Sequence, residues 1–157
     1  LLVQASGRAG RGESQGEVFI QTYTPEHYSI ITAARQDYLA FYEQEILYRK
    51  MLSYPPEAHI MAVMVTGRRE DVVEFSAGFL KEALEAGFLN MDQIMMIGPA
   101  KASIAKLNDI YRQVMYVKAK DYGILVEAKN FLEGFSRYSE RMKQVSVQFD
   151  FDPMSSY

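Results

Sequence analysis

The sequence predicts an α+β fold, in which a helical connector precedes a compact domain of alternating strands and helices. Two runs of residues indicate this. HIMAVMVTG is apolar on both faces, as a buried central strand is, and QVSVQFDFDP alternates apolar with polar residues, as a half-buried strand does. Between these runs lie two longer segments whose apolar residues recur with helical spacing. Strands and helices therefore share one domain.

Composition excludes several classes of protein. The chain has 157 residues, of which 48% are hydrophobic and 24% charged, as in a packed domain. Its net charge of −3 gives no overall nucleic-acid signature, so any such binding needs a local basic patch. The absence of Cys excludes disulfides and Cys-based zinc sites within this segment. No apolar run approaches the ~18–20 residues of a membrane-spanning helix, so we expect a cytoplasmic protein with no membrane partner.

The first half of the compact domain, expected over residues 58–157, reads as strand, helix, strand and loop. The helix REDVVEFSAGFLKEALEAG follows the strand HIMAVMVTG and ends at Gly87, a residue typical of helix C-caps. DQIMMIG then reads as a second strand and PAKASIAKLND as the loop after it. The helix is expected to bury one face, made of Val72, Phe75, Phe79 and Ala83.

The second half reads as strand, helix and strand. YRQVMYVKAKD is expected to place Met115, Val117 and Ala119 on one side. The helix YGILVEAKNFLEGFSRYSERM follows, and the last strand turns alternate residues inward. The order β-α-β-β-α-β is that of the ferredoxin-like arrangement, with two helices on one face of four strands. The inward residues expected for this helix and this strand are Ile124, Ala128, Phe131, Phe135 and Tyr138, then Val145, Val147, Phe149 and Phe151.

Two further segments precede the domain. Residues 1–24 read as a Gly-rich loop followed by a strand, EVFIQTY, which is expected to be the last strand of a sheet whose other strands lie elsewhere. Residues 25–57 read as a helical connector with Pro25 in its first turn and Pro55 and Pro56 after its end. The connector is expected to have an aromatic face, and the residues that recur in it at helical spacing are Tyr38, Phe41, Tyr42, Glu45, Ile46 and Arg49.

The opening run QASGRAGR, which fits the pattern Gln-x-x-Gly-Arg-x-Gly-Arg, has the chemistry of a phosphate site. Arg8 and Arg11 are permanently charged and can bind phosphate oxygens bidentately. Gly7 and Gly10 let a backbone approach a ligand closely and take conformations closed to other residues. A flexible basic terminus whose arginines are incidental is the alternative.

A second candidate site lies in residues 101–120, which contain five cations and a single acid, Asp109. Cations interleaved with aromatic rings suit single-stranded nucleic acid, because phosphates pair with the cations and bases stack on the rings. The simpler alternative places Lys118 and Lys120 on the solvated face of a strand. The candidate DNA-binding residues are Lys101, Lys106, Tyr111, Arg112, Lys118 and Lys120.

Four runs in order, GRAGRGESQGEVFIQTYTPEHYSI, DYLAFYEQEILYRKMLSYPP, IGPAKASIAKLNDIYRQVMYVKA and FDFDP, resemble the bacterial primosomal replication-restart helicases, the primosomal protein N′ family. The resemblance covers essentially the whole chain. It implies that QASGRAGR corresponds to the sixth motif of superfamily 2 helicases. Arg11 would then be an arginine finger, Arg8 a second phosphate contact and Gln4 a nucleotide-sensing group.

By the same resemblance, residues 1–24 would be the end of the second helicase lobe. Residues 25–57 would connect this lobe to the C-terminal domain. Residues 58–157 would be that domain, which binds DNA and partner proteins. The parent would be an ATP-dependent 3′→5′ DNA helicase that recognises stalled or branched forks and restarts replication by primosome assembly. Its partners would be branched and single-stranded DNA, the single-stranded-DNA-binding protein and other primosome proteins.

ATP and Mg would serve the parent, and its zinc would lie outside this segment. No phosphate-binding P-loop occurs here, so we expect this segment alone to bind none of these cofactors and to be inactive as an ATPase. A standalone ferredoxin-like module that binds nucleic acid or protein, without motor activity, remains the alternative function.

Overall fold

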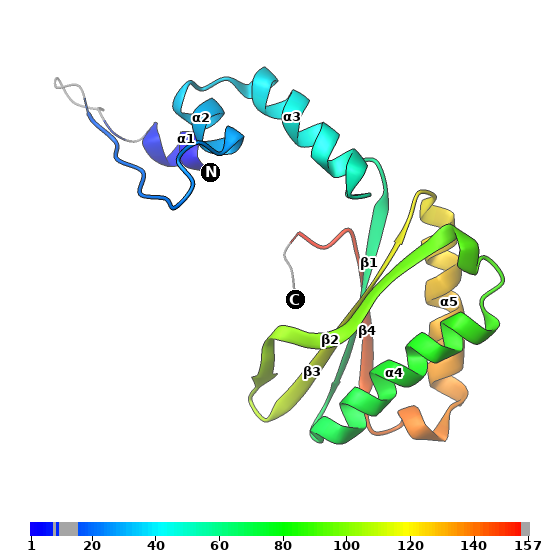
Figure 1. The fold of residues 1–157 in the computed structure, drawn as a ribbon. Coiled ribbons are helices and arrows are strands. Elements are labelled where there is room, and N and C mark those ends of the chain that lie inside the picture. Colours follow the sequence, from blue (N-terminus) through cyan, green and yellow to red (C-terminus); the bar gives the residue numbers. More distant parts are fainter. Residues whose placement is uncertain (8, 10–15, 155–157) are drawn as a thin grey trace. The chain divides into compact units, whose positions relative to one another are not determined.

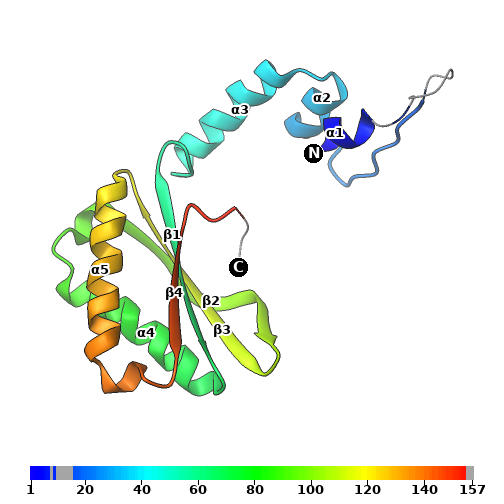
Figure 2. The ribbon, with the colours of Figure 1, turned by 180° about the vertical axis from the view of Figure 1, so that it is seen from behind.

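The computed structural model of this chain describes residues 1–7, 9 and 16–154 (Figure 1). The chain divides into two compact units, Leu1–Arg49 and Lys50–Tyr157. The second unit contains a four-stranded sheet and two long helices, which Figure 2 shows from behind.

The sheet of the second unit has the order β2-β3-β1-β4, and every neighbouring pair is antiparallel. Helices α4 and α5 lie on one face of it (Figures 1 and 2). The predicted α+β fold and the order β-α-β-β-α-β are therefore confirmed. The elements are β1 (His59–Gly67), α4 (Glu70–Gly87), η1 (Met91–Gln93), β2 (Ile94–Leu107), β3 (Ile110–Ala119), α5 (Tyr122–Tyr138), η2 (Glu140–Met142) and β4 (Ser146–Phe151).

The main core lies between the sheet and the two helices. Because side chains alternate along a strand, every second residue of β1, β3 and β4 turns toward the helices. The inward residues predicted for β3 and β4 are confirmed, since Met115, Val117 and Ala119 are buried and Val147, Phe149 and Phe151 pack against them. A smaller cluster of Ala62, Ala102 and Val114, with Tyr116 packed on it, lies on the opposite face.

The face that α4 buries differs from the predicted one. Leu80 and Leu84 are fully buried, whereas Phe75 is 53% exposed. Phe75 instead stacks on Phe79 with ring centroids 5.9 Å apart, and Phe79 contacts Phe135 of α5. The aliphatic row fits closely against the sheet. Phe79 packs on the core as predicted, whereas Phe75 lies on the outer side of the helix. The buried row is Val73, Ser76, Ala77, Leu80 and Leu84.

Two details of the helix pair also correct the prediction. α4 ends at Gly87 as predicted, but its C-cap is Phe88 and Gly87 has no left-handed conformation. A Cβ at Gly87 would lie only 3.0 Å from the Phe131 ring. The glycine therefore permits a close approach of α5. On α5, Leu125 and Leu132 are fully buried, although the predicted face omitted them. Ala128 is buried as expected, and Ile124, Phe131 and Phe135 pack on the core.

The segment predicted as a loop over residues 99–109 is mostly strand. β2 continues to Leu107, and only Asn108 and Asp109 separate it from β3. Both have positive φ, 50° and 59°, which suits a tight two-residue hairpin turn. The register shifts between Ile97 and Ala100 and again further along, which identifies bulges. Pairing with β3 thus prevails over the low strand propensity of this segment, which is rich in Ala and Lys.

The end of the FDFDP run closes the sheet beside β1. Oδ1 of Asp152 accepts a hydrogen bond from the Ile60 N–H at 2.9 Å, and its Oδ2 lies 2.9 Å from Nδ1 of His59. The His59 ring also meets Tyr122 edge-on, with centroids 5.2 Å apart. His59 therefore has a structural role.

The first unit is helical, and its connector departs from the prediction in one way. The connector forms two helices because Gln36, at φ 53°, breaks the chain between them. Pro25 precedes the first of these, which His27 caps by accepting from the Ser29 N–H. Residues 17–23, predicted as a strand whose partner strands lie elsewhere, pair with no strand in the described chain, so this strand stays a prediction. The helices are α1 (Leu2–Ser6), α2 (Tyr28–Ala34) and α3 (Tyr38–Met51).

Candidate nucleic-acid interface

The β2–β3 hairpin contains five of the six predicted DNA-binding residues, but its register divides them between two faces. Tyr111 packs against the helix-side core, and Lys101 reaches α4 on that same side. Arg112 lies opposite Thr66 and Lys118 opposite Ile60, positions that alternate with the core residues of β1. The sixth residue, Lys120, follows β3 directly. The hairpin thus presents cations on both sides.

The two cations of β2 are paired with acids of the chain. Nζ of Lys101 lies 2.7 Å from a carboxylate oxygen of Glu70, the first residue of α4. Nζ of Lys106 lies 2.9 Å from Asp109 and 4.9 Å from the centre of the Tyr111 ring. These contacts raise the pKa of both ammonium groups. Both pairs are solvent-exposed, so a phosphate can displace the carboxylates at small cost.

Arg112 projects from the opposite face of the hairpin. One of its Nη2–H groups donates to Sδ of Met64 at 3.4 Å, and it forms no ion pair among the described residues. Part of its donor fork therefore stays available for an anion. A cavity of about 400 Å³ opens on the same face, lined by Ala62, Met64, Gln148, Phe149 and Asp150.

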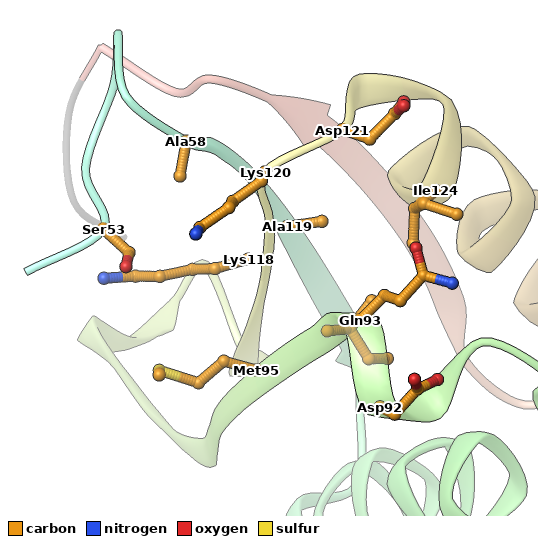
Figure 3. Close-up of a pocket in the computed structure, with 11 residues that line it drawn as sticks. Ser53, Ala58, Asp92, Gln93, Met95, Lys118, Ala119, Lys120, Asp121 and Ile124 are labelled. Atoms are coloured by element: carbon orange, nitrogen blue, oxygen red, sulfur yellow. The ribbon is translucent and has the colours of Figure 1, made fainter. Parts of the chain in front are cut away.

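Lys118 is buried, which excludes the simpler interpretation that it is a solvated strand residue. It is 6% exposed, its Nζ lies 3.7 Å from the centre of the Tyr54 ring, and it donates to the Leu52 carbonyl at 3.1 Å. Burial lowers the pKa of its ammonium. Lys118 and the exposed Lys120 both line a cavity of about 440 Å³ (Figure 3).

The described part of the opening motif lies in and after α1. Gln4 belongs to this helix and lines a cavity of about 550 Å³ together with residues of α2 and α3. Gly7 follows the helix at φ −65°, a conformation open to any residue, so it does not adopt here the special backbone conformation expected of a glycine. Arg8, Gly10 and Arg11 lie outside the described residues.

Among residues 1–7, 9 and 16–154, no three His, Asp or Glu side chains come together as metal ligands would. Within the same residues, no helix combines the length and the apolar character needed to cross a membrane.

Three contacts of the basic residues were not evident in the sequence. Glu70 meets Lys101 across 31 positions, and Leu52 and Tyr54 meet Lys118 across more than sixty. No spacing rule links such distant residues. The one available signal is Tyr54 itself, an aromatic residue immediately before Pro55, where the chain leaves the connector.

Comparison with known proteins gives one consistent result. The family model of the primosomal protein N C-terminal domain matches residues 50–154. Proteins named replication restart protein PriA are similar along the chain. That of Bacillus subtilis is 37% identical over 98% of this chain and 19% of its own length. That of Synechocystis is 35% identical over 98% of this chain and 18% of its own length. That of Thermotoga maritima is 40% identical over 77% of this chain and 15% of its own length.

This chain spans less than a fifth of the length of these three relatives. Residues 50–154 hold the whole sheet and both long helices, so the match to the family model covers the complete fold of the second unit. The chain belongs to the family of the primosomal protein N C-terminal domain.

Proposed function

We propose that this chain is the C-terminal part of an ATP-dependent 3′→5′ DNA helicase that recognises branched forks and restarts replication. Its second unit binds DNA and primosome proteins, among them the single-stranded-DNA-binding protein. The motor lies mostly in other parts of the parent. The parent acts in the cytoplasm. ATP, Mg and zinc belong to the parent outside this unit. The chain alone then shows no ATP hydrolysis, because the sequence lacks a P-loop.

The similarity to relatives supports the helicase part of this proposal. Relatives that are named for replication restart match 98% of this chain, so the resemblance includes the first unit as well as the domain. A standalone module would share only the domain. In the parent, Arg8 and Arg11 would contact nucleotide phosphates and Gln4 would sense the nucleotide.

The observation that favours DNA binding by the second unit is the concentration of cations on one hairpin. Lys101, Lys106 and Arg112 all project from β2 and β3 in an otherwise acidic chain. The carboxylates on Lys101 and Lys106 are exposed partners, which a phosphate can replace. Phosphate contacts of this kind supply most of the affinity in binding that is not sequence-specific.

Charge reversal tests this proposal. The triple variant Lys101→Glu, Lys106→Glu, Arg112→Glu should bind a fluorescent forked DNA at least about tenfold more weakly than the wild-type chain at low salt. The matched control is Lys81→Glu, Arg137→Glu, Lys143→Glu, which changes the net charge equally at exposed, ion-paired residues away from the hairpin. Equal affinity of the two variants contradicts the proposed interface.

A further inference from the structure

The buried ammonium of Lys118, which lines the cavity shown in Figure 3, forms no ion pair with an acid of the described chain. Lys118 is nine-tenths buried, and within the described chain its ammonium contacts only a carbonyl and an aromatic ring. Taking an ammonium out of water is costly unless an anion compensates. An ammonium has three donors, and here a single carbonyl accepts one of them.

A second ammonium lies at the same end of this cavity. Figure 3 shows the side chains of Lys118 and Lys120 pointing in the same direction, toward Ser53. The carboxylates of Asp92 and Asp121 lie on the other side of the cavity and point away from them. The Asp121 carboxylate is already engaged, since it accepts from the Gly123 N–H at the start of α5. The lysine end therefore suits an anion.

An aromatic ring, that of Tyr54, borders the Lys118 ammonium. One face of the Tyr54 ring is covered by Nζ of Lys118, yet Tyr54 is 43% exposed. A planar group can therefore stack on the outer face of the ring. The intervening Ser53 has φ 51°, a left-handed conformation that is uncommon for serine and fixes the course of the chain between Leu52 and Tyr54.

We propose that Tyr54, Lys118 and Lys120 form a subsite for one nucleotide of single-stranded DNA, with its phosphate on the two lysines and its base on the Tyr54 ring. This inference rests on the proposed DNA-binding function. It adds a nucleotide pocket that is separate from the phosphate contacts of Lys101, Lys106 and Arg112. Cations beside an exposed ring are the combination that binds single strands without reading their sequence. Compact lysine ammonium groups also suit phosphate as point charges.

The test uses the 157-residue chain and an oligothymidylate of about eight nucleotides, a length within the usual site sizes of such proteins. Tyr54→Leu should weaken binding by about fivefold or more, because base stacking is lost. Tyr54→Phe keeps the ring and should bind as the wild type does. Lys120→Gln should flatten the dependence of log affinity on log salt by about 0.7, the loss of one phosphate contact. An abasic oligonucleotide with the same phosphates should bind more weakly than oligothymidylate.

Lys118→Met removes the buried ammonium and so tests the subsite most directly. Thermal unfolding of this variant shows whether the domain still folds. If Lys118→Met does not fold, the comparison of Tyr54→Leu with Tyr54→Phe and the salt dependence of Lys120→Gln decide whether the subsite exists. Wild-type affinity in Tyr54→Leu overturns the subsite, as does preferential binding of an oligoglutamate peptide at these residues. If the hairpin triple variant is weakened while Tyr54→Leu is not, only the subsite fails. If the wild-type chain binds no DNA, the proposed function fails as well.

Discussion

The ammonium of Lys101 lies 2.7 Å from the carboxylate of Glu70, so the first turn of α4 holds the first cation of the β2–β3 hairpin. The pair joins strand to helix at an exposed edge of the domain. Because both groups are exposed, the contact adds little to stability, yet it partly neutralises the charge that a phosphate would meet.

Removing this carboxylate should therefore strengthen DNA binding. Glu70→Gln is expected to bind forked DNA about two- to fivefold more tightly at low salt, and screening should remove the gain at high salt. Fluorescence anisotropy at two salt concentrations measures the effect. Glu85→Gln, on the same helix beside Lys81, is the control. A Glu70→Gln variant with unchanged or weaker binding would show that Lys101 does not contact DNA.

The hydrogen bond from Tyr28 to Glu45 ties α2 to α3 and predicts an unusual titration. Bonding to this carboxylate raises the Tyr28 pKa from its ordinary 10.0 to about 12. A raised folded pKa means that the stabilisation is complete below pH 10 and is lost as pH rises through about 12. When the absorbance titration of Tyr28→Phe is subtracted from that of the wild-type chain, the difference should show one phenol with a pKa near 12.

The same bond lowers the pKa of the Glu45 carboxyl, with help from Arg49. Its stabilising effect is therefore present above the ordinary value of 4.5 and is lost as pH falls through the lowered pKa. Glu45→Ala should return the Tyr28 titration to the ordinary range. A difference titration centred near 10 in the wild-type chain would show that this bond does not form.

Two glycines should respond in opposite directions to alanine. Gly78 lies within α4, and a Cβ there would contact nothing within 4 Å in the described chain, so Gly78→Ala should stabilise by ~0.5–1 kcal/mol. Gly98 has φ 96°, and its Cβ would lie 2.9 Å from the Val114 carbonyl oxygen. Gly98→Ala should destabilise by ~1–3 kcal/mol. Urea unfolding measures both, and a Gly98→Ala variant at least as stable as the wild-type chain would contradict the backbone described for Gly98.

The buried face of α4 can be tested with one aliphatic and one aromatic residue. Leu80 is fully buried, and Leu80→Ala should lower the free energy of unfolding by ~2–5 kcal/mol. Phe75 is half exposed, and Phe75→Ala should cost less than about 1 kcal/mol. Chemical denaturation of the two variants compares them. A larger loss for Phe75→Ala would restore the face expected from the sequence.

The strands and their order could be predicted from sequence because their patterns are strong. The apolar run 59–67 gives the bounds of β1, and strict alternation places Val147, Phe149 and Phe151 inward. The face of α4 could not be predicted in this way. Its aromatic and aliphatic rows both have helical spacing, and only the fit against the sheet selects Leu80 over Phe75.

The candidate site was predicted in composition but not in arrangement. The basic residues of 101–120 were evident, yet the second half of β2 resembles a loop in sequence, because pairing with β3 sets its conformation. A contact such as Lys118 with Tyr54 depends on the fold bringing the end of the connector beside β3. Local spacing contains no information about it.

The salt dependence of DNA binding tests the central claim, that the β2–β3 hairpin contacts DNA phosphates, most directly. Each lost phosphate contact flattens the slope of log affinity against log salt by roughly 0.7–0.9. The variant Lys101→Glu, Lys106→Glu, Arg112→Glu should therefore have a slope shallower than that of the wild-type chain by about 2–3. Equal slopes for the two proteins would contradict the claim.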